Sequence, residues 1–216
     1  MKGYTKPLLL IFLVLLADQL LKFWIKLNMS IGQEYRILGD WFIIHFTENN
    51  GMAFGFEFGG ETGKLALSIL RIIAVSGIGY GLVYLIKHKY HRGLILNVSL
   101  IFAGALGNII DSTFYGKIFS ESTYFDKATL FPADGGYAGI FHGKVVDMLY
   151  FPIINTQYPS WFPFWANQPL VFFQPVFNLA DTAISIGVIL ILIFQKHYFK
   201  EPEVLESQPQ SEMVEE

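Results

Sequence analysis

The chain has 216 residues, of which 53% are hydrophobic and only 15% are charged, and its mean hydropathy is +0.43. This composition is too apolar for an ordinary soluble domain and is typical of a membrane protein with several spans. The net charge of −3 and the absence of a long basic block argue against nucleic acid as a partner. The absence of cysteine excludes disulfides, thiolate catalysis and cysteine-based metal sites.

The first predicted membrane span covers about 7–27 and is preceded by Lys2 and Lys6. A basic start followed by an apolar run also resembles a secretory signal peptide. No small-x-small cleavage pattern follows, and the apolar character continues beyond Asp18. We therefore favour a span that is retained in the protein.

The segment 28–64 is predicted to form a small β-rich sheet outside the membrane. It is rich in aromatic residues, β-branched residues and glycine, and it carries turn signals at Gly39-Asp40 and Asn50-Gly51. Such a composition favours short strands joined by tight turns.

Three further apolar runs predict spans at about 65–86, 93–111 and 176–195. A long polar and aromatic segment, 112–174, precedes the last of them, and the acidic tail 201–216 is expected to be disordered in the cytoplasm. The predicted fold is therefore a membrane protein with four transmembrane helices, a small external β-rich segment and external insertions.

The distribution of basic residues sets the predicted orientation. The N-terminal lysines, the 87–92 loop and the basic residues at 196–200 are expected on the cytoplasmic side. Both termini would then be cytoplasmic, with 28–64 and 112–174 on the outer side.

This topology brings polar residues from distant stretches to one depth, at the outer edge of the helices. Ionisable residues at membrane depth cost roughly 2.5–3.5 kcal/mol each on insertion scales, so they are usually functional or paired. The converging residues are Asp18, Lys22, Asn108, Asp111, Asp147, Asn178 and Asp181.

Structural roles stay open for several of these residues. Asp18 and Lys22 are four residues apart and can pair with each other on one helix face. Bridging between helix backbones, or support of a helix end, would equally account for Asn108, Asn178 and Asp111.

Asp147 and Asp181 are harder to explain as structural residues. Asp147 lies in the apolar segment KVVDMLYF, and a long uncharged run follows Asp181. No HExxH pattern is present and the histidines are scattered, so a zinc site is not predicted. Two neighbouring carboxylates share a proton, so one can activate water as a base while the other protonates or polarises a carbonyl. Asp181, near a helix N-terminus, would be the better stabilised anion.

Five short blocks in this order resemble the lipoprotein signal peptidase family, the type II signal peptidases of bacteria. The blocks are DQLLK (18–22), NNGMAF (49–54), GALGNIID (104–111), VVD (145–147) and FNLAD with the following Ile184 (177–184). The resemblance implies that Asp147 and Asp181 are the catalytic pair of an aspartic endopeptidase. It implies substrate-binding or supporting roles for Asp18, Lys22, Asn49, Gly51, Asn108, Asp111 and Asn178.

The resemblance also implies a substrate and a location. The family cleaves the signal peptide of diacylglyceryl-modified prolipoproteins just before the lipidated cysteine, without a metal or cofactor. The expected partners are these prolipoproteins and membrane lipid, with no obligate protein partner. The expected location is the bacterial cytoplasmic (inner) membrane, with the active site at its outer face.

The chain departs from the family pattern in two ways. Ser112 stands where the family usually has arginine, so another cation is expected to replace it or the support is lost. Arg71 is expected to extend to the outer interface. The gaps between the later blocks are also long, at 112–144 and 148–176. We expect the first insertion to pack beside the site and help to hold substrate, the alternative being a surface loop without such a role.

Two other classes of protein are compatible with an acidic membrane chain. A proton-coupled transporter or channel component would use carboxylates to relay protons, and it would place them near the midplane, commonly with an inverted repeat. Here the acids cluster at the outer edge and no repeat is visible. A scaffold subunit would leave the carboxylates without a role, so the peptidase is the preferred interpretation.

Overall fold

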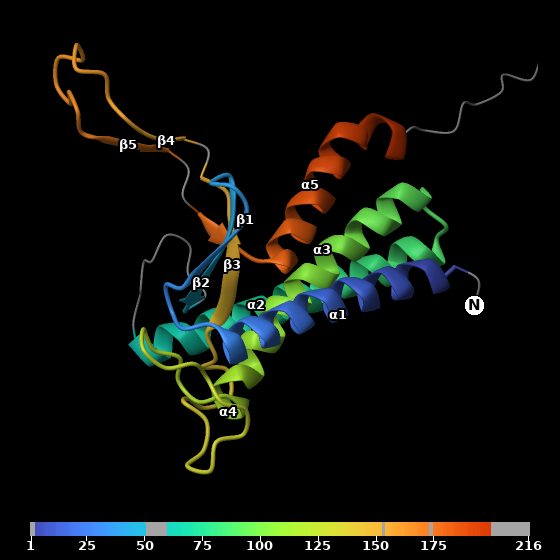
Figure 1. Ribbon diagram of the computed structural model, residues 1–216. Helices are drawn as coiled ribbons and strands as arrows, with labels where there is room; N and C mark the ends of the chain where they lie inside the picture. Colours follow the sequence, from blue (N-terminus) through green and yellow to red (C-terminus); the bar gives the residue numbers. More distant parts are fainter. Residues whose placement is uncertain (1–2, 51–59, 153, 173–174, 200–216) are drawn as a thin grey trace, which may run out of the picture.

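The computed structural model is built around four long helices (Figure 1). It describes residues 3–50, 60–152, 154–172 and 175–199. Within these ranges, four helices are long and apolar enough to cross a membrane, which confirms the predicted fold class. They are α1 (Thr5–Asn28), α2 (Gly60–Lys87), α3 (Arg92–Ile110) and α5 (Leu179–Tyr198).

The outward faces of these helices are apolar. Large side chains such as Phe12, Leu70 and Ile193 are more than half exposed, at 59%, 62% and 65%. Apolar surface of this kind is unfavourable in water but needs no cover in hydrocarbon. Away from its ends, an α-helix satisfies its backbone polar groups internally, as a lipid environment requires.

Glycines set the close approach of α3 to its neighbours. A methyl group at Gly104 would lie 2.2 Å from the carbonyl oxygen of Ala180 at the start of α5. At Gly107 it would lie 2.9 Å from the Asp18 carboxylate of α1. The small residues of the GALGN block therefore allow the helices that carry the acidic residues to touch.

Three helix boundaries differ from the predicted ones. α2 begins at Gly60 rather than at about 65, so the end of the predicted β-rich segment is helical. The third helical path does not end at 111 but continues through a π-helical turn, η2 (Asp111–Tyr115), into α4 (Gly116–Ile118). The helix predicted from 176 begins at Leu179, because the side chain of Asn178 caps it. Apolar character alone locates a span without locating these ends.

A four-stranded antiparallel sheet lies at one end of the helices (Figure 1). Its strand order is β1-β2-β3-β6, with the bounds β1 (Glu34–Leu38), β2 (Phe42–Asn49), β3 (Val145–Tyr150) and β6 (Val176–Phe177). The predicted turn at Gly39-Asp40 joins β1 to β2, and Gly39 has a φ of +57°, which favours glycine. Gly51, in the second predicted turn, lies outside the described residues.

The main apolar core of the extramembrane part fills the space between the end of α1, the sheet and the first insertion. The insertion contributes Tyr115 and Phe119, both fully buried, against Phe46 of β2 and Met148 of β3. This packing joins residues 112–144 firmly to the sheet.

The second insertion has a different form. Residues Ile154–Gln157 (β4) and Pro169–Phe172 (β5) pair as a separate two-stranded hairpin. In Figure 1 this hairpin extends to the upper left, away from the sheet and the helices.

Candidate active site

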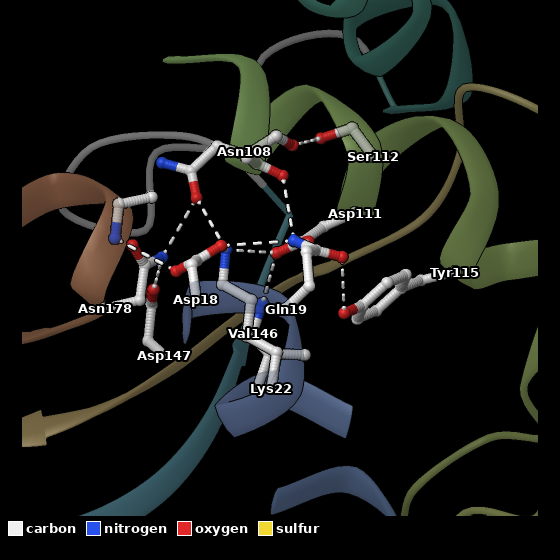
Figure 2. Close-up of polar contacts among 12 residues, drawn as sticks. Asp18, Gln19, Lys22, Asn108, Asp111, Ser112, Tyr115, Val146, Asp147 and Asn178 are labelled. Atoms are coloured by element: carbon white, nitrogen blue, oxygen red, sulfur yellow. Dashed lines mark hydrogen bonds and ion pairs between the residues drawn. The ribbon is translucent and has the colours of Figure 1, made fainter. Parts of the chain in front are cut away.

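The polar residues singled out from the sequence converge where α1, α3 and α5 meet the sheet (Figure 2). Gly51 is the one member of the predicted set that lies outside the described residues. Each of the others forms a hydrogen bond or an ion pair with another member of the set: Asp18, Lys22, Asn49, Asn108, Asp111, Asp147, Asn178 and Asp181.

Lys22 is the centre of the buried part of this network. Its Nζ lies 2.9 Å from Asp18 Oδ2 and 2.7 Å from Asp111 Oδ2, and it donates to Asn108 Oδ1 at 3.0 Å. All three charged side chains are 0–1% exposed. The Asp18–Lys22 pair therefore exists, but it is shared with α3 rather than confined to one helix face.

Asp18 also reaches the fourth membrane helix. Its Oδ1 accepts a hydrogen bond from the backbone N–H of Ala180 at 3.0 Å. The first turn of a helix has backbone N–H groups without an intrahelical partner, and a carboxylate stabilises that end. One carboxylate thus links α1, the α3 region through Lys22, and the N-terminus of α5.

A capping box positions Asp181. The side chain of Asn178 accepts from the backbone N–H of Asp181 at 2.9 Å, and the Asp181 carboxylate accepts from the backbone N–H of Asn178 at 3.3 Å. Asp181 Oδ1 also accepts from Asn108 Nδ2 at 2.7 Å. The carboxylate is held by two elements and stays partly exposed.

Asp147 lies on β3 and shares Asn178 with the helix turn that carries Asp181. Its Oδ1 accepts from Asn178 Nδ2 at 2.7 Å, and its Oδ2 accepts from Asn49 Nδ2 at 3.4 Å. The pKa of Asp147 is raised to about 7, chiefly by burial of the side chain and next by the negative charge of Asp181. Near neutral pH, Asp147 can hold a proton that an ordinary aspartate would lose.

Two residues of this network carry no independent signal in the sequence. Gln19 donates to Asp111 Oδ1 at 3.0 Å and to Asp18 Oδ2 at 3.1 Å, and it accepts from the hydroxyl of Tyr115 at 3.1 Å. Gln19 adjoins Asp18 in the first block, but Tyr115 is one of many aromatic residues in the insertion. The π-helical turn at the end of α3 places Tyr115 in the network.

Arg71 lies against the π-helical turn at the end of α3. Its Nη1 is 3.5 Å from Ser112 Oγ, the position where the family pattern usually has arginine. Its charge interacts with the carboxylates of Asp181, Asp147 and Asp111, in that order of strength. α2 therefore supplies a cation close to the place where the pattern lacks one.

The described residues contain no group of three or more histidine, aspartate or glutamate side chains that could hold a metal ion. Lys22 occupies the space between Asp18 and Asp111. The expectation of a reaction without metal or cofactor stays a prediction.

The helices able to cross a membrane, with carboxylates joined by asparagine amides at one end, define a multi-pass membrane protein with an acidic polar site. The chain belongs to the signal peptidase (SPase) II family, which it matches over residues 10–196. It is thus an aspartic peptidase of the signal peptidase II type, as the order of blocks predicted.

Similar proteins cover most of the chain. A lipoprotein signal peptidase of Porphyromonas gingivalis is 52% identical over 85% of this chain and 80% of its own length. One from Amoebophilus asiaticus is 40% identical, covering 88% of this chain and 77% of its own length. A solved bacterial membrane enzyme is similar in structure, with a TM-score of 0.57 and 26% identity over 94% of this chain and 93% of that one.

Proposed function

We propose that this enzyme removes the signal peptide of diacylglyceryl-modified prolipoproteins by cutting before the lipidated cysteine, with Asp147 and Asp181 as its catalytic pair. The observation that carries the proposal is the shared asparagine. Asn178 donates to Asp147 at 2.7 Å and caps the helix turn that carries Asp181. Asn178 thereby holds the carboxylates of Asp147 and Asp181 near each other, although the first is buried and the second is partly exposed.

The chemistry follows from this inequality. The more buried Asp147 carries the proton, and the partly exposed Asp181 at the helix N-terminus is the anion. Asp181 takes a proton from water as the water oxygen attacks the scissile carbonyl carbon, while Asp147 donates its proton to the carbonyl oxygen. Breakdown of the tetrahedral intermediate breaks the C–N bond. Asp181 gives the proton that it took from water to the leaving nitrogen, and Asp147 takes back a proton from a hydroxyl of the intermediate. The products are a carboxylate and the free amino group of cysteine.

The Lys22 network supports the pair without touching the substrate in this proposal. Lys22 holds Asn108 Oδ1, which leaves the Asn108 amide group free to donate to Asp181. Asp111 accepts from the backbone N–H of Val146 at 3.4 Å, beside Asp147 on β3. These contacts orient both acids, and a buried hydrogen-bonded network of this kind restricts side-chain rotation.

The first insertion is proposed to hold substrate beside the pair. Gly143 lies so close to α3 that a methyl group there would be 2.1 Å from the carbonyl oxygen of Asp111. Its backbone N–H donates to Ser112 O at 2.8 Å, and Phe141 O accepts from Ser68 of α2 at 3.0 Å. The insertion thus covers the end of α3 next to the acids, which suits a role in binding.

The pair can be tested by substitution in the full-length protein. Asp147→Asn and Asp181→Asn should each lower cleavage of a lipidated prolipoprotein by at least about 100-fold, because each removes a proton-transfer partner. Asp134→Asn, at an exposed position on the first insertion, is the matched control and should cleave normally. Turnover near the wild-type rate in either folded dyad variant would contradict the assignment.

We also propose that both ends of the chain face the cytoplasm and that the site faces outward across the bacterial inner membrane. The start of α1, the α2–α3 connection and the end of α5 lie together, opposite the sheet (Figure 1). A single cysteine placed at position 90 should resist an impermeant thiol reagent added to intact cells. Efficient labelling there, with the membrane unbroken, would reverse the orientation.

A further inference from the structure

The β4–β5 hairpin ends in an ordered loop. Beyond the two strands, the backbone N–H of Tyr158 donates to Gln168 O at 2.9 Å, and that of Asn167 donates to Tyr158 O at 3.0 Å. Phe162 N and Gln168 N each donate to a carbonyl three residues earlier, both at 3.0 Å. The tip is therefore a defined surface, here called the aromatic tip, residues 158–168.

Aromatic side chains of the tip pack on one another. The ring of Phe162 lies 5.0 Å from that of Tyr158 and 5.9 Å from those of Trp161 and Trp165. Phe162 and Tyr158 are thereby partly covered, whereas Trp161 and Phe164 stay 76% and 78% exposed. A cluster that holds its own rings together presents the outermost ones in a fixed arrangement.

The surroundings of the tip are free of charge. From 148 to 180 the sequence contains no Asp, Glu, Lys, Arg or His. The first insertion is of comparable length and also has exposed aromatic residues, but it carries charges at Lys117, Glu121, Asp126, Lys127, Asp134 and Lys144. The lack of charge is thus particular to the hairpin segment and is not a general property of the external parts.

The hairpin starts and ends close to the membrane-spanning part. It leaves the sheet after β3, and the chain returns through β6 directly into α5. In Figure 1 it extends to the upper left, beyond the sheet and away from the helices, whereas α5 rises to the upper right. The segment is therefore attached at both ends to the elements that carry Asp147 and Asp181, β3 and α5.

We propose that the aromatic tip inserts into the headgroup region of the outer leaflet, so that its partner is the lipid surface beside the active site. Tryptophan and tyrosine concentrate at this depth in membrane proteins because their rings are apolar at one end and polar at the other. A protein partner would be expected to meet some charge for specificity, and the tip offers none. The exposed Trp161 and Phe164, which are unfavourable in water, have a suitable surrounding there.

The natural absence of cysteine allows a direct depth measurement. A nitroxide is attached to Ser160→Cys, at an exposed position in the tip, in full-length protein reconstituted into vesicles of phosphatidylcholine and phosphatidylglycerol. Collisions with oxygen, which concentrates in lipid, are compared with collisions with a water-soluble nickel chelate. Asp134→Cys on the first insertion is the matched control, because Asp134 is exposed on a charged loop.

Oxygen should dominate at position 160 and the nickel chelate at position 134. Equal, water-like accessibility at both positions would overturn the proposal. Disulfide formation between two copies of the unlabelled Ser160→Cys protein would instead make the tip a contact between copies and would equally overturn it. Cleavage activity of the labelled protein checks its fold and does not depend on the result.

Fluorescence provides an independent reading without a label. In a Trp24→Phe/Trp41→Phe variant, the emission comes from Trp161 and Trp165. Phosphatidylcholine brominated near the headgroup end of its acyl chains should quench this emission, and aqueous acrylamide should quench it poorly. The opposite pattern would place the tip in water and contradict the proposal.

Discussion

Two buried lysines on α1 occupy similar positions and serve different regions of the molecule. Lys22 and Lys26 are one helical turn apart, and both side chains are completely buried. A buried lysine must find opposite charge or hydrogen-bond acceptors. The partners of Lys22 belong to the candidate active site, whereas the partners of Lys26 belong to the surface that supports the first insertion.

The Lys22 region has excess negative charge and is connected to the acids. Asp18 and Asp111 both pair with Lys22, and Asn108 joins it to Asp181. One cation against two carboxylates leaves this cluster with a negative charge if both are ionised. Its connections run toward the proposed catalytic pair.

The Lys26 region has no excess of negative charge, and its connections run away from the acids. Lys26 pairs with Glu48 of β2 and donates to Ser122 Oγ of the insertion at 3.0 Å. Glu48 also pairs with Lys144 at 3.5 Å. The Lys26 ammonium lies 5.2 Å from the centre of the Phe119 ring, which gives a cation–π contact. This region fastens the first insertion to α1 and the sheet.

The comparison shows that equal burial does not mean equal function. Both lysines contribute to folding through a pair that would be costly to break. Only Lys22 is connected, through one asparagine, to a carboxylate that is proposed to do chemistry. The two regions should therefore respond similarly in stability and differently in turnover.

The largest expected effect separates them directly. Lys22→Met and Lys26→Met should each lower the free energy of unfolding by about 3–5 kcal/mol. The first removes the cation between Asp18 and Asp111, and the second leaves buried Glu48 with only the more distant Lys144. Lys22→Met should also reduce kcat on the order of 100-fold, equivalent to about 2.7 kcal/mol. Lys26→Met should instead raise KM for lipidated substrate, since it loosens the insertion. Thermal denaturation and steady-state cleavage at a temperature where both variants are folded measure the two effects.

An equal loss of kcat in both variants would remove the distinction between the two regions. Arg36→Gln is a suitable control, because Arg36 pairs with Asp40 at an exposed position and should affect neither quantity.

A smaller loss of kcat is expected for substitution of Arg71. This prediction tests whether Arg71 belongs with the Lys22 region. Arg71 is proposed to position the acids through its charge and its contact with Ser112. Arg71→Gln should lower kcat about tenfold, close to 1.4 kcal/mol, with little change in KM. Arg71→Lys should retain more activity than Arg71→Gln, because it keeps the charge.

Relocating the charge distinguishes this role from simple packing. Adding Ser112→Arg to the Arg71→Gln variant restores a cation on the neighbouring element and should recover part of kcat. If the double variant is no more active than Arg71→Gln while remaining folded, the positioning role of Arg71 is wrong.

The smallest effect concerns pH. With the pKa of Asp147 raised to about 7, a reaction that needs its proton should decline as the pH rises through that value. The Asn178 amide stabilises the Asp147 carboxylate and lowers its pKa, so Asn178→Ala should move the alkaline limb of kcat/KM to higher pH. A limb that stays in place, in a variant that still turns over, would show that another group is titrating.

The raised pKa of Asp147 also predicts how the stability of the folded state changes with pH. Between the ordinary value of 3.8 and about 7, folded Asp147 keeps its proton while the unfolded chain loses it. The native state then binds more protons, so the contribution of this group to stability falls as pH rises across that window.

The sequence by itself determined the four membrane helices, the β1–β2 hairpin with its turn at Gly39, and the family. Those features depend on local properties, since a hydrocarbon layer demands about 20 apolar residues in a row and a tight turn demands particular residues. The acids at 18, 111, 147 and 181 were conspicuous for the same reason, because charge is rare in apolar surroundings.

Only the tertiary structure decided which partner each charged residue has. Lys22 and Lys26 have similar neighbours in sequence, yet one meets Asp111 and the other Glu48 and Ser122. Arg71, Gln19 and Tyr115 join the site because α2 lies against the end of α3, and because a π-helical turn rotates the chain after Asp111. Burial and pairing depend on segments up to 162 residues apart, as for Asp18 and Ala180, and no local pattern records such contacts.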